Sequence, residues 1–511
     1  MLNSNIAPGD SAMYPAGVEP VFQEMPVTRK RNTNMSRRCF LQAAAGAAMV
    51  RPMRRVFGAE APKASRPNFI IIFTDDQGYQ DVGCFGSKTI RTPRLDKMAS
   101  EGVKFTSFYA QTVCGPSRAA LMTGCYPLRV AKRNNQVDIH PFLHDKEITI
   151  AEILKTAGYA TACFGKWDLA GHSQRRYDPK LLPTRQGFDY FFGTPTSNDS
   201  VVNILRNEKV IEKRADMNTL TKRYTEEAVK FITSNRSKPF FVYMPHTMPH
   251  TLLGASKQFK GKSKRGLYGD VIEEIDWSVG RILDTVKALG LDDNTYVLFF
   301  SDNGPWEKKG GRGGSALPLR GAKTSSWEGG LRVPCIMRAP GRIPAGKVCD
   351  EIACTMDMNP TLAKLAGARA PDDRVIDGHD ISDLMHGKRG AKSPTKAFYY
   401  YVHTHLQAVR SGKWKLHLAR PAEPPWGPRW ASHIKREDVM EIPNPMLFDL
   451  EADIGERKDV AEANRDVVAR LLKLAEWARQ DIGDYNVIGK NARFFDPQPK
   501  RPDAAKWINK T

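Results

Sequence analysis

The chain has 511 residues, of which 41% are hydrophobic, so it can bury a large core and is expected to form two or more domains, which excludes a disordered chain or a small disulfide-stapled scaffold. Its formal net charge is +21; residues 1–66 hold ten Lys/Arg and four Asp/Glu, or +6, which leaves +15 for the rest. This excess suits a polyanionic partner, but no zinc-finger, RNA-binding or helix-turn-helix signature favours nucleic acid, and the alternative is a solvated basic surface.

The N-terminal segment resembles a twin-arginine export signal. Ser36 to Leu41 reads SRRCFL, and a short apolar run from Ala43 to Val50 follows it. The run is too short for a stable membrane span. We therefore expect residues 1–66 to be a leader that the twin-arginine export machinery recognises, and the protein to be periplasmic or extracellular. The alternative is a disordered basic tail, because Arg51, Arg54 and Arg55 interrupt the run before a candidate cleavage site at 59–61.

Apolar runs rich in β-branched and aromatic residues predict buried strands of a parallel sheet; they span 68–73, 240–244 and 296–300. Polar residues follow each run, namely Asp75 and Asp76, then 245–250, then Asp302 and Asn303. Helical patterns at 149–156 and 269–289 lie between the strands. This alternation predicts an α/β fold with a doubly wound, mostly parallel sheet flanked by helices, and a site at the carboxyl ends of its strands.

The pattern changes near Ala397, which predicts a smaller C-terminal α+β domain. Short strands are expected at 398–402 and 414–418, a Pro/Trp-rich loop at 421–430, and an amphipathic helix at 467–482. The expected domains are thus a leader at 1–66, a catalytic domain at 67–396 and the small domain at 397–511.

The most informative motif is Cys114-Gly115-Pro116-Ser117-Arg118, which continues to Gly124 as CGPSRAALMTG. Pro116 suits the first position of a helix, so Cys114 is expected at a helix N-terminus, where free N–H groups favour an anion. The motif resembles that of the type I, formylglycine-dependent sulfatases, which are arylsulfatase A-like members of the alkaline phosphatase superfamily. The resemblance implies that a maturation enzyme converts Cys114 to Cα-formylglycine. None of the eight cysteines forms the CxxC pairs of a structural zinc site.

Two further segments resemble the metal-binding motifs of this family. Asp75-Asp76-Gln77-Gly78 matches its DDxG, and Asp302-Asn303-Gly304 matches its second metal segment. Either alone is common in turns. Together with formylglycine 114, the resemblance implies one Ca²⁺ per chain, held by Asp75, Asp76, Asp302 and Asn303. An all-oxygen shell suits Ca²⁺ better than Mg²⁺.

The segment 323–334 resembles the family's KxxxWEGGxRVP, which implies that Lys323 contacts the sulfate, whereas Glu328, Gly329 and Arg332 are expected to be structural. His250 matches the histidine of the family's HTxPH segment, which meets the leaving-group oxygen. His246 is the local competitor for that role and is expected to lie farther from the substrate.

One segment departs from the family. Gly165-Lys166-Trp167-Asp168-Leu169 retains the lysine of GKWHL, but Asp168 replaces the histidine that assists sulfate release. An aspartate can accept the same proton, yet it adds negative charge beside a metal and an anionic substrate. His172, four residues on, is the alternative base.

The resemblance therefore implies a sulfuric ester hydrolase that acts by covalent catalysis on a sulfated small molecule or glycan. Lys166, Lys323 and Arg118 stabilise the transferring group, Asp302 helps to deprotonate the nucleophile, His250 protonates the leaving alcohol and Asp168 is the base for sulfate release. The alternatives are a phosphate or phosphonate ester hydrolase of the same superfamily, and a non-catalytic sulfoglycan-binding protein.

Overall fold

The computed structural model describes residues 66–130, 143–174, 176–421, 441–485 and 487–493. The expected leader, apart from Arg66, and the loop expected at 421–430, apart from Pro421, lie outside these residues. In the part of the chain that is described, no helix has both the length and the apolar character that a membrane crossing requires.

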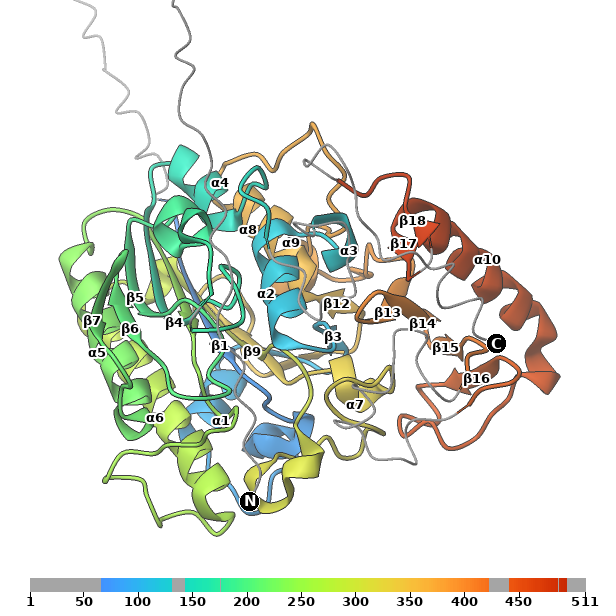
Figure 1. The fold of residues 1–511 in the computed structure, drawn as a ribbon, viewed down its shortest axis with the longest axis horizontal. Helices are drawn as coiled ribbons and strands as arrows, with labels where there is room; N and C mark the ends of the chain where they lie inside the picture. The colour runs from blue at the N-terminus through green and yellow to red at the C-terminus, as the bar shows by residue number, and fades with distance from the viewer. Residues whose placement is uncertain (1–65, 131–142, 175, 422–440, 486, 494–511) are drawn as a thin grey trace, which may run out of the picture. The chain divides into compact units, whose positions relative to one another are not determined.

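A ten-stranded sheet forms the centre of the fold, in the order β11-β2-β10-β9-β1-β8-β4-β5-β6-β7 (Figure 1). Its strands are β1 (Asn68–Thr74), β2 (Val103–Phe105), β4 (Ala160–Lys166), β5 (Tyr190–Thr194), β6 (Ile204–Arg206), β7 (Lys209–Glu212), β8 (Phe240–Pro245), β9 (Thr295–Ser301), β10 (Cys335–Arg338) and β11 (Lys347–Cys349). The five strands from β9 to β5 run parallel, whereas β10, β6 and β7 pair antiparallel with their neighbours. The expected α/β sheet is confirmed, with antiparallel strands toward both edges.

Helices cover both faces of this sheet because its central strands are apolar on both sides. Ile70 and Ile72 of β1 share a core with one set of helices, whereas Ile71 and Phe73 share another core with a second set. The first set is α1 (Pro93–Ser100), α5 (Leu220–Ser234) and α6 (Gly266–Ala288), and the second is α2 (Cys114–Thr123), α4 (Ile150–Thr156) and α8 (Met358–Leu365). Successive side chains of a strand point to opposite faces, which explains the division.

The C-terminal part forms a separate antiparallel sheet in the order β13-β14-β15-β16, with α10 (Arg465–Asp481) packed against it (Figure 1). The strands are β13 (Phe398–Val402), β14 (His405–Ser411), β15 (Trp414–His417) and β16 (Met446–Asp449). The smaller α+β part is thus confirmed, while its boundary at 396/397 stays a prediction. Besides several 3-10 turns, the short remaining α-helices and strands of the described residues are α3 (Pro127–Val130), α7 (Glu328–Leu331), α9 (Ser382–Met385), β3 (Phe108–Tyr109), β12 (Ala353–Cys354), β17 (Gly483–Asp484) and β18 (Val487–Ile488).

Candidate active site

The candidate site lies where neighbouring central strands end. Thr74 and Ser301, the last residues of β1 and β9, are register partners, so Asp75 and Asp302 leave the sheet side by side. On the other side of β1, β8 continues into the segment that carries His250, and β4 ends at Lys166. Charged side chains that the sequence scatters over more than 200 positions are therefore buried together at one edge, as open α/β sheets favour.

The oxygen atoms at this edge fit a hard cation. Asp75 Oδ1, Asp76 Oδ2 and Asn303 Oδ1 are buried, and no hydrogen-bond donor within the described residues satisfies them. Ligand atoms of Asp75, Asp76, Cys114 and His250 also lie within 4.8 Å of one another. Buried oxygens without a donor are costly unless a cation or water meets them. Carboxylate and amide oxygens are the ligands that Ca²⁺ and Mg²⁺ prefer.

Cys114 is the first residue of α2, whose helix N-terminus points its free N–H groups into the site. The expectation that Pro116 opens the helix is wrong by two positions, because Pro116 is the third residue; it still lies in the first turn, where its missing N–H costs nothing. Burial, and then the Asp75 charge, raises the pKa of the Cys114 thiol well above its usual value. An unmodified Cys114 is therefore a poor nucleophile at neutral pH.

Three cationic side chains lie among the carboxylates. Lys166 Nζ donates to Asp75 Oδ2 at 2.6 Å, and Lys323 Nζ donates to Asp76 Oδ1 at 2.6 Å. Burial alone would raise the pKa of Asp75, but Lys166, His250 and Arg118 together hold it well below its usual range. Lys166 and Asp75 thus stay charged together in the interior. Burial, and then the Asp75 charge, instead raises the pKa of the Asp302 carboxyl well above its usual value.

Arg118 contacts two of the carboxylates and the main chain of Lys166. Its Nη1 donates to the Lys166 carbonyl at 2.6 Å, and its Nη2 donates to Asp302 Oδ2 at 2.9 Å and lies 3.4 Å from Asp75 Oδ2. The guanidinium is fully buried and lies over the Phe73 ring. These contacts orient Asp75 and Asp302, and the expected contact of Arg118 with the transferring group stays a prediction.

Asp168, the residue that departs from the family motif, is held in a chain of charges. Its Oδ1 lies 3.1 Å from His172 Nδ1, and His172 Nε2 lies 2.8 Å from Asp199 Oδ2. Lys166 Nζ is 3.7 Å from Asp168 Oδ2. The structure therefore brings together Asp168 and His172, the two residues that the sequence offers as the base for sulfate release. It adds Asp199, which sequence reasoning missed because no motif marks this loop residue.

His250 and His246 lie in different surroundings. His250 Nδ1 faces the Thr251 carbonyl and therefore carries a proton, which leaves Nε2 3.7 Å from Asp76 Oδ2 and 3.5 Å from Asp199 Oδ1. His246 is fully buried, both its ring nitrogens lack a hydrogen-bond partner within the described residues, and burial lowers its pKa to about 4. Of these two histidines, His250 contacts the charged cluster and His246 does not.

The backbone is strained at the same place. Asp76, Asp168 and Thr324 have φ of 64°, 54° and 70°, in the left-handed region that non-glycine residues seldom adopt. Such residues cluster at functional sites, where the surrounding structure enforces them. Asp76 and Asp168 are themselves charged site residues, and Thr324 directly follows Lys323, which is another. The surrounding structure therefore fixes the backbone at or next to three charged residues of the site.

Glu328 anchors a second buried network next to the site. Tyr109 Oη and Tyr400 Oη donate to it at 2.6 and 2.7 Å, and Lys415 Nζ and Arg332 Nη1 at 3.0 and 3.3 Å. These donors come from both the large sheet region and the C-terminal sheet. The contacts fit the structural role expected of Glu328 and Arg332.

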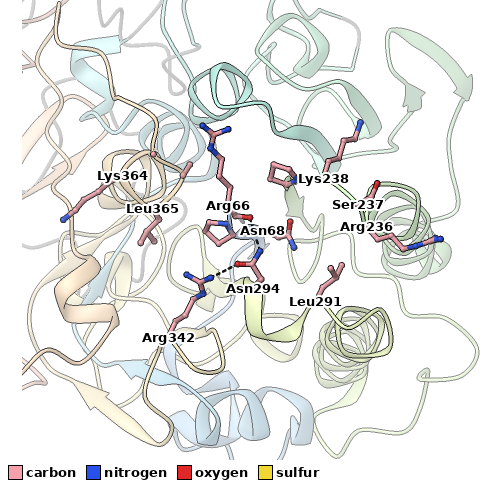
Figure 2. Close-up of a pocket in the computed structure, with 14 residues that line it drawn as sticks. Arg66, Asn68, Arg236, Ser237, Lys238, Leu291, Asn294, Arg342, Lys364 and Leu365 are labelled. Carbon is pink, nitrogen blue, oxygen red and sulfur yellow. Dashed lines mark hydrogen bonds between the residues drawn. The ribbon is translucent and has the colours of Figure 1, made fainter. Parts of the chain in front are cut away.

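The hollow of 730 Å³ shown in Figure 2 lies at the amino-terminal ends of the same strands, opposite the candidate site. Its charged lining residues are Arg66, Arg236, Lys238, Arg342 and Lys364. Arg342 Nη2 donates to Asn294 Oδ1 at 2.6 Å across it. This basic hollow is distinct from the strand-end cluster.

The family profile described as Sulfatase matches residues 67–368, and that of the C-terminal region of aryl-sulfatase matches residues 393–499. The chain therefore belongs to the sulfatase family and is a sulfuric ester hydrolase. The resemblance inferred from the motifs is confirmed.

The similar proteins extend along most of the chain. Human steryl-sulfatase (Homo sapiens) is 34% identical over 88% of this chain and 92% of its own length. N-acetylgalactosamine-6-sulfatase of Mus musculus is 36% identical over 84% of this chain and 88% of its own length. The solved PsFucS1 sulfatase from Pseudoalteromonas sp. has 26% identity and a TM-score of 0.70, covering 80% of this chain and 89% of that one.

Proposed function

We propose that this sulfatase hydrolyses sulfate monoesters of carbohydrates through a formylglycine formed from Cys114, with one bound Ca²⁺. The observation that carries the proposal is the position of Cys114: its sulfur lies at the N-terminus of α2, 3.5 Å from Lys323 Nζ and beside Asp75 and Asp76. Carbohydrate sulfatases among the similar proteins and the net positive charge support a sulfated glycan as the substrate class.

Formylglycine would supply a hydrated aldehyde, in which one hydroxyl attacks sulfur and the second allows sulfate to leave. The CGPSR motif and the buried thiol with its raised pKa support this modification over a cysteine nucleophile. Ca²⁺, held by Asp75, Asp76, Asp302 and Asn303, would supply a Lewis acid that offsets the charge of the nucleophile and the sulfate.

The remaining steps belong to side chains of this chain. Lys166 and Lys323 bind the sulfate oxygens, because their ammonium groups lie beside the metal ligands and Cys114. Arg118 is a positioning residue for Asp75 and Asp302. His250 protonates the departing alcohol oxygen from Nε2 in its doubly protonated form, in which Nδ1–H faces the Thr251 carbonyl and Nε2–H faces the Asp76 and Asp199 carboxylates. Asp168 accepts the proton that is released before sulfate leaves.

The test is to produce the full chain with a formylglycine maturation enzyme, to measure the mass of the Cys114 peptide, and to compare turnover of chromogenic sulfate, phosphate and phosphonate esters. We expect conversion of Cys114 and a clear preference for the sulfate ester. Faster phosphate or phosphonate turnover would favour the second hydrolase class. Modified protein that binds sulfated glycans without turnover would show a binding protein.

We also propose that residues 1–66 direct the protein through the twin-arginine export machinery to the periplasm or the outside of the cell. The SRRCFL segment and the apolar run after it support this location. Replacement of Arg37 and Arg38 by Lys should retain the protein in the cytoplasm, which cell fractionation would measure.

A further inference from the structure

The negative charge of Asp168 is unfavourable for sulfate binding unless nearby residues neutralise it. A carboxylate at this position adds a negative charge to a pocket that, on the proposed function, must hold an anionic sulfate. The side chain is buried, so water does not screen that charge effectively. Lys166 lies 3.7 Å away, but its shortest contact, at 2.6 Å, is with Asp75.

His172 supplies the missing positive charge. Each of its ring nitrogens faces a carboxylate oxygen: Nδ1 lies 3.1 Å from Asp168 Oδ1, and Nε2 lies 2.8 Å from Asp199 Oδ2. Only an imidazolium can donate from both nitrogens. Burial alone would lower the pKa of His172, but the Asp168 and Asp199 carboxylates outweigh burial and raise that pKa to about 9.

The loop after β4 is built to return His172 to Asp168. Asp168 itself adopts a left-handed conformation, with φ of 54°. Gly171 packs so closely that a Cβ there would lie 2.6 Å from the Arg176 carbonyl oxygen. On the far side, Ser197 Oγ donates to Asp199 Oδ2 at 2.8 Å and fixes the second carboxylate. Both partners of His172 are therefore held in place before a substrate arrives.

We propose that His172 is a positioning residue that neutralises and orients Asp168, so that the Asp168–His172 pair occupies the place of the single histidine usual in the family. This inference rests on the proposed function. The buried Asp168 carboxylate and the imidazolium together carry no net charge, as a neutral histidine does, and the pair still offers an oxygen that accepts a proton. With Asp199 the three residues carry one negative charge, but the Asp199 side chain is 47% exposed, so water screens its charge more than that of the buried Asp168. Asp199 completes the unit by holding His172 from the other side.

Asp199 also connects His172 to His250. Asp199 Oδ1 lies 3.5 Å from His250 Nε2, while its Oδ2 contacts His172. The position of Asp199 is therefore shared by the residue proposed to protonate the alcohol and by the residue that supports the base. We expect Asp199→Asn to weaken both contacts.

A double-mutant cycle on the matured full chain tests the proposal: parent, His172→Asn, Asp168→His and the double variant. We expect His172→Asn to lower kcat/KM for a chromogenic sulfate ester about 10- to 100-fold in the parent, as loss of a supporting partner does. In the Asp168→His background, the same change should cost no more than about twofold, because the Asp168 carboxylate that His172 neutralises is gone, and only the contact of His172 with the partly exposed Asp199 remains. Equal losses in both backgrounds would overturn the pairing.

A second readout does not depend on turnover. In ¹⁵N-histidine NMR of the unmodified full chain at pH 7, His172, assigned by its absence in His172→Asn, should show two protonated ring nitrogens. Asp168→Asn should shift this signal toward a neutral ring, and His172→Gln provides a second variant if His172→Asn fails to fold. A neutral His172 in the parent would overturn the proposal. An inactive parent with correctly modified Cys114 would instead count against the proposed function.

Discussion

Lys323 Nζ lies 3.5 Å from Cys114 Sγ, although 209 positions separate the two residues in the sequence. The same ammonium group donates to Asp76 Oδ1 at 2.6 Å. Lys323 therefore links Cys114, the proposed position of the nucleophile, to a candidate metal ligand. A permanent positive charge at this point favours any step in which negative charge develops on a transferring sulfate.

Replacement of Lys323 by Met removes that charge and keeps the length of the side chain. We expect kcat/KM for a sulfate ester to fall by about 10²- to 10³-fold, the range for loss of one preorganised electrostatic group. Lys347→Met, at an exposed position of β11, is the matched control and should leave the rate unchanged. Steady-state kinetics of both variants decide the matter, and equal rates would remove Lys323 from the sulfate site.

Cys114→Ala should abolish turnover, because both attack and release need the two hydroxyls of the hydrated aldehyde. The side chain is small and buried, so a modest loss of stability is expected, with the fold retained. Circular dichroism and an activity assay on the same preparation measure the two effects. Substantial activity in a folded Cys114→Ala protein would contradict the proposed nucleophile.

Chelation should inactivate the enzyme, and Ca²⁺ should restore it better than Mg²⁺ or Zn²⁺. The reason is the set of buried oxygens without donors at Asp75, Asp76 and Asn303. Binding at 100 times Kd should also stabilise the fold by about 2.7 kcal/mol, visible as a higher Tm. Asp76→Asn should reduce the Ca²⁺-dependent shift in Tm, and full activity after complete metal removal would argue against the site.

The His172 pair predicts a pH dependence of stability. The pKa of His172 rises from 6.5 to about 9 on folding, so the folded state binds the proton more tightly. Its stabilising contribution is fully present below pH 6.5 and is lost as the pH rises through about 9. Thermal unfolding of the parent should therefore lose more stability than His172→Asn over this range. Parallel pH profiles for the two proteins would contradict the folded ion pair.

Glu328→Ala should destabilise the fold by about 3–5 kcal/mol, because it leaves Lys415 and Arg332 buried with fewer compensating charges. Glu226→Ala, at an exposed position of α5, is the control and should change the free energy of unfolding by less than about 0.5 kcal/mol. Denaturant titration measures both variants. A loss as small as that of the control would mean that the network relaxes without cost.

The sequence predicts three central strands, β1, β8 and β9, because they are continuous apolar runs, and the polar residues after them mark the site edge. It does not predict the other seven strands of this sheet, among them the central β4 and β5, whose segments contain glycine and threonine. The same rule misses β14. That strand is buried along most of its length, but it contains Arg410, which is held by Tyr109 and the Gly412 carbonyl. A buried charge with partners supplied by other elements has no signature in a hydrophobic pattern.

Site residues inside extended motifs, such as Lys323 and His250, can be named from the sequence because their neighbours identify the segment. Asp199 cannot, since its role follows from the pairing of β4 with β5, which places the loop after β5 beside the loop after β4. The relation of His172 to Asp168 is likewise a matter of loop geometry. Spacing of four residues indicates contact on a helix, but the segment after β4 is not helical.

The CGPSR segment around Cys114, on which the proposed modification depends, is buried in the folded chain. Cys114 is 2% exposed, and Ser117 and Arg118 are fully buried with their polar groups bonded to Asp302 and the Lys166 carbonyl. An enzyme that reads these side chains and oxidises the thiol can reach them only in an extended chain. On the proposed function, conversion of Cys114 would therefore have to come before folding during biosynthesis, and protein purified with an unmodified thiol would not be activated afterwards without first being unfolded.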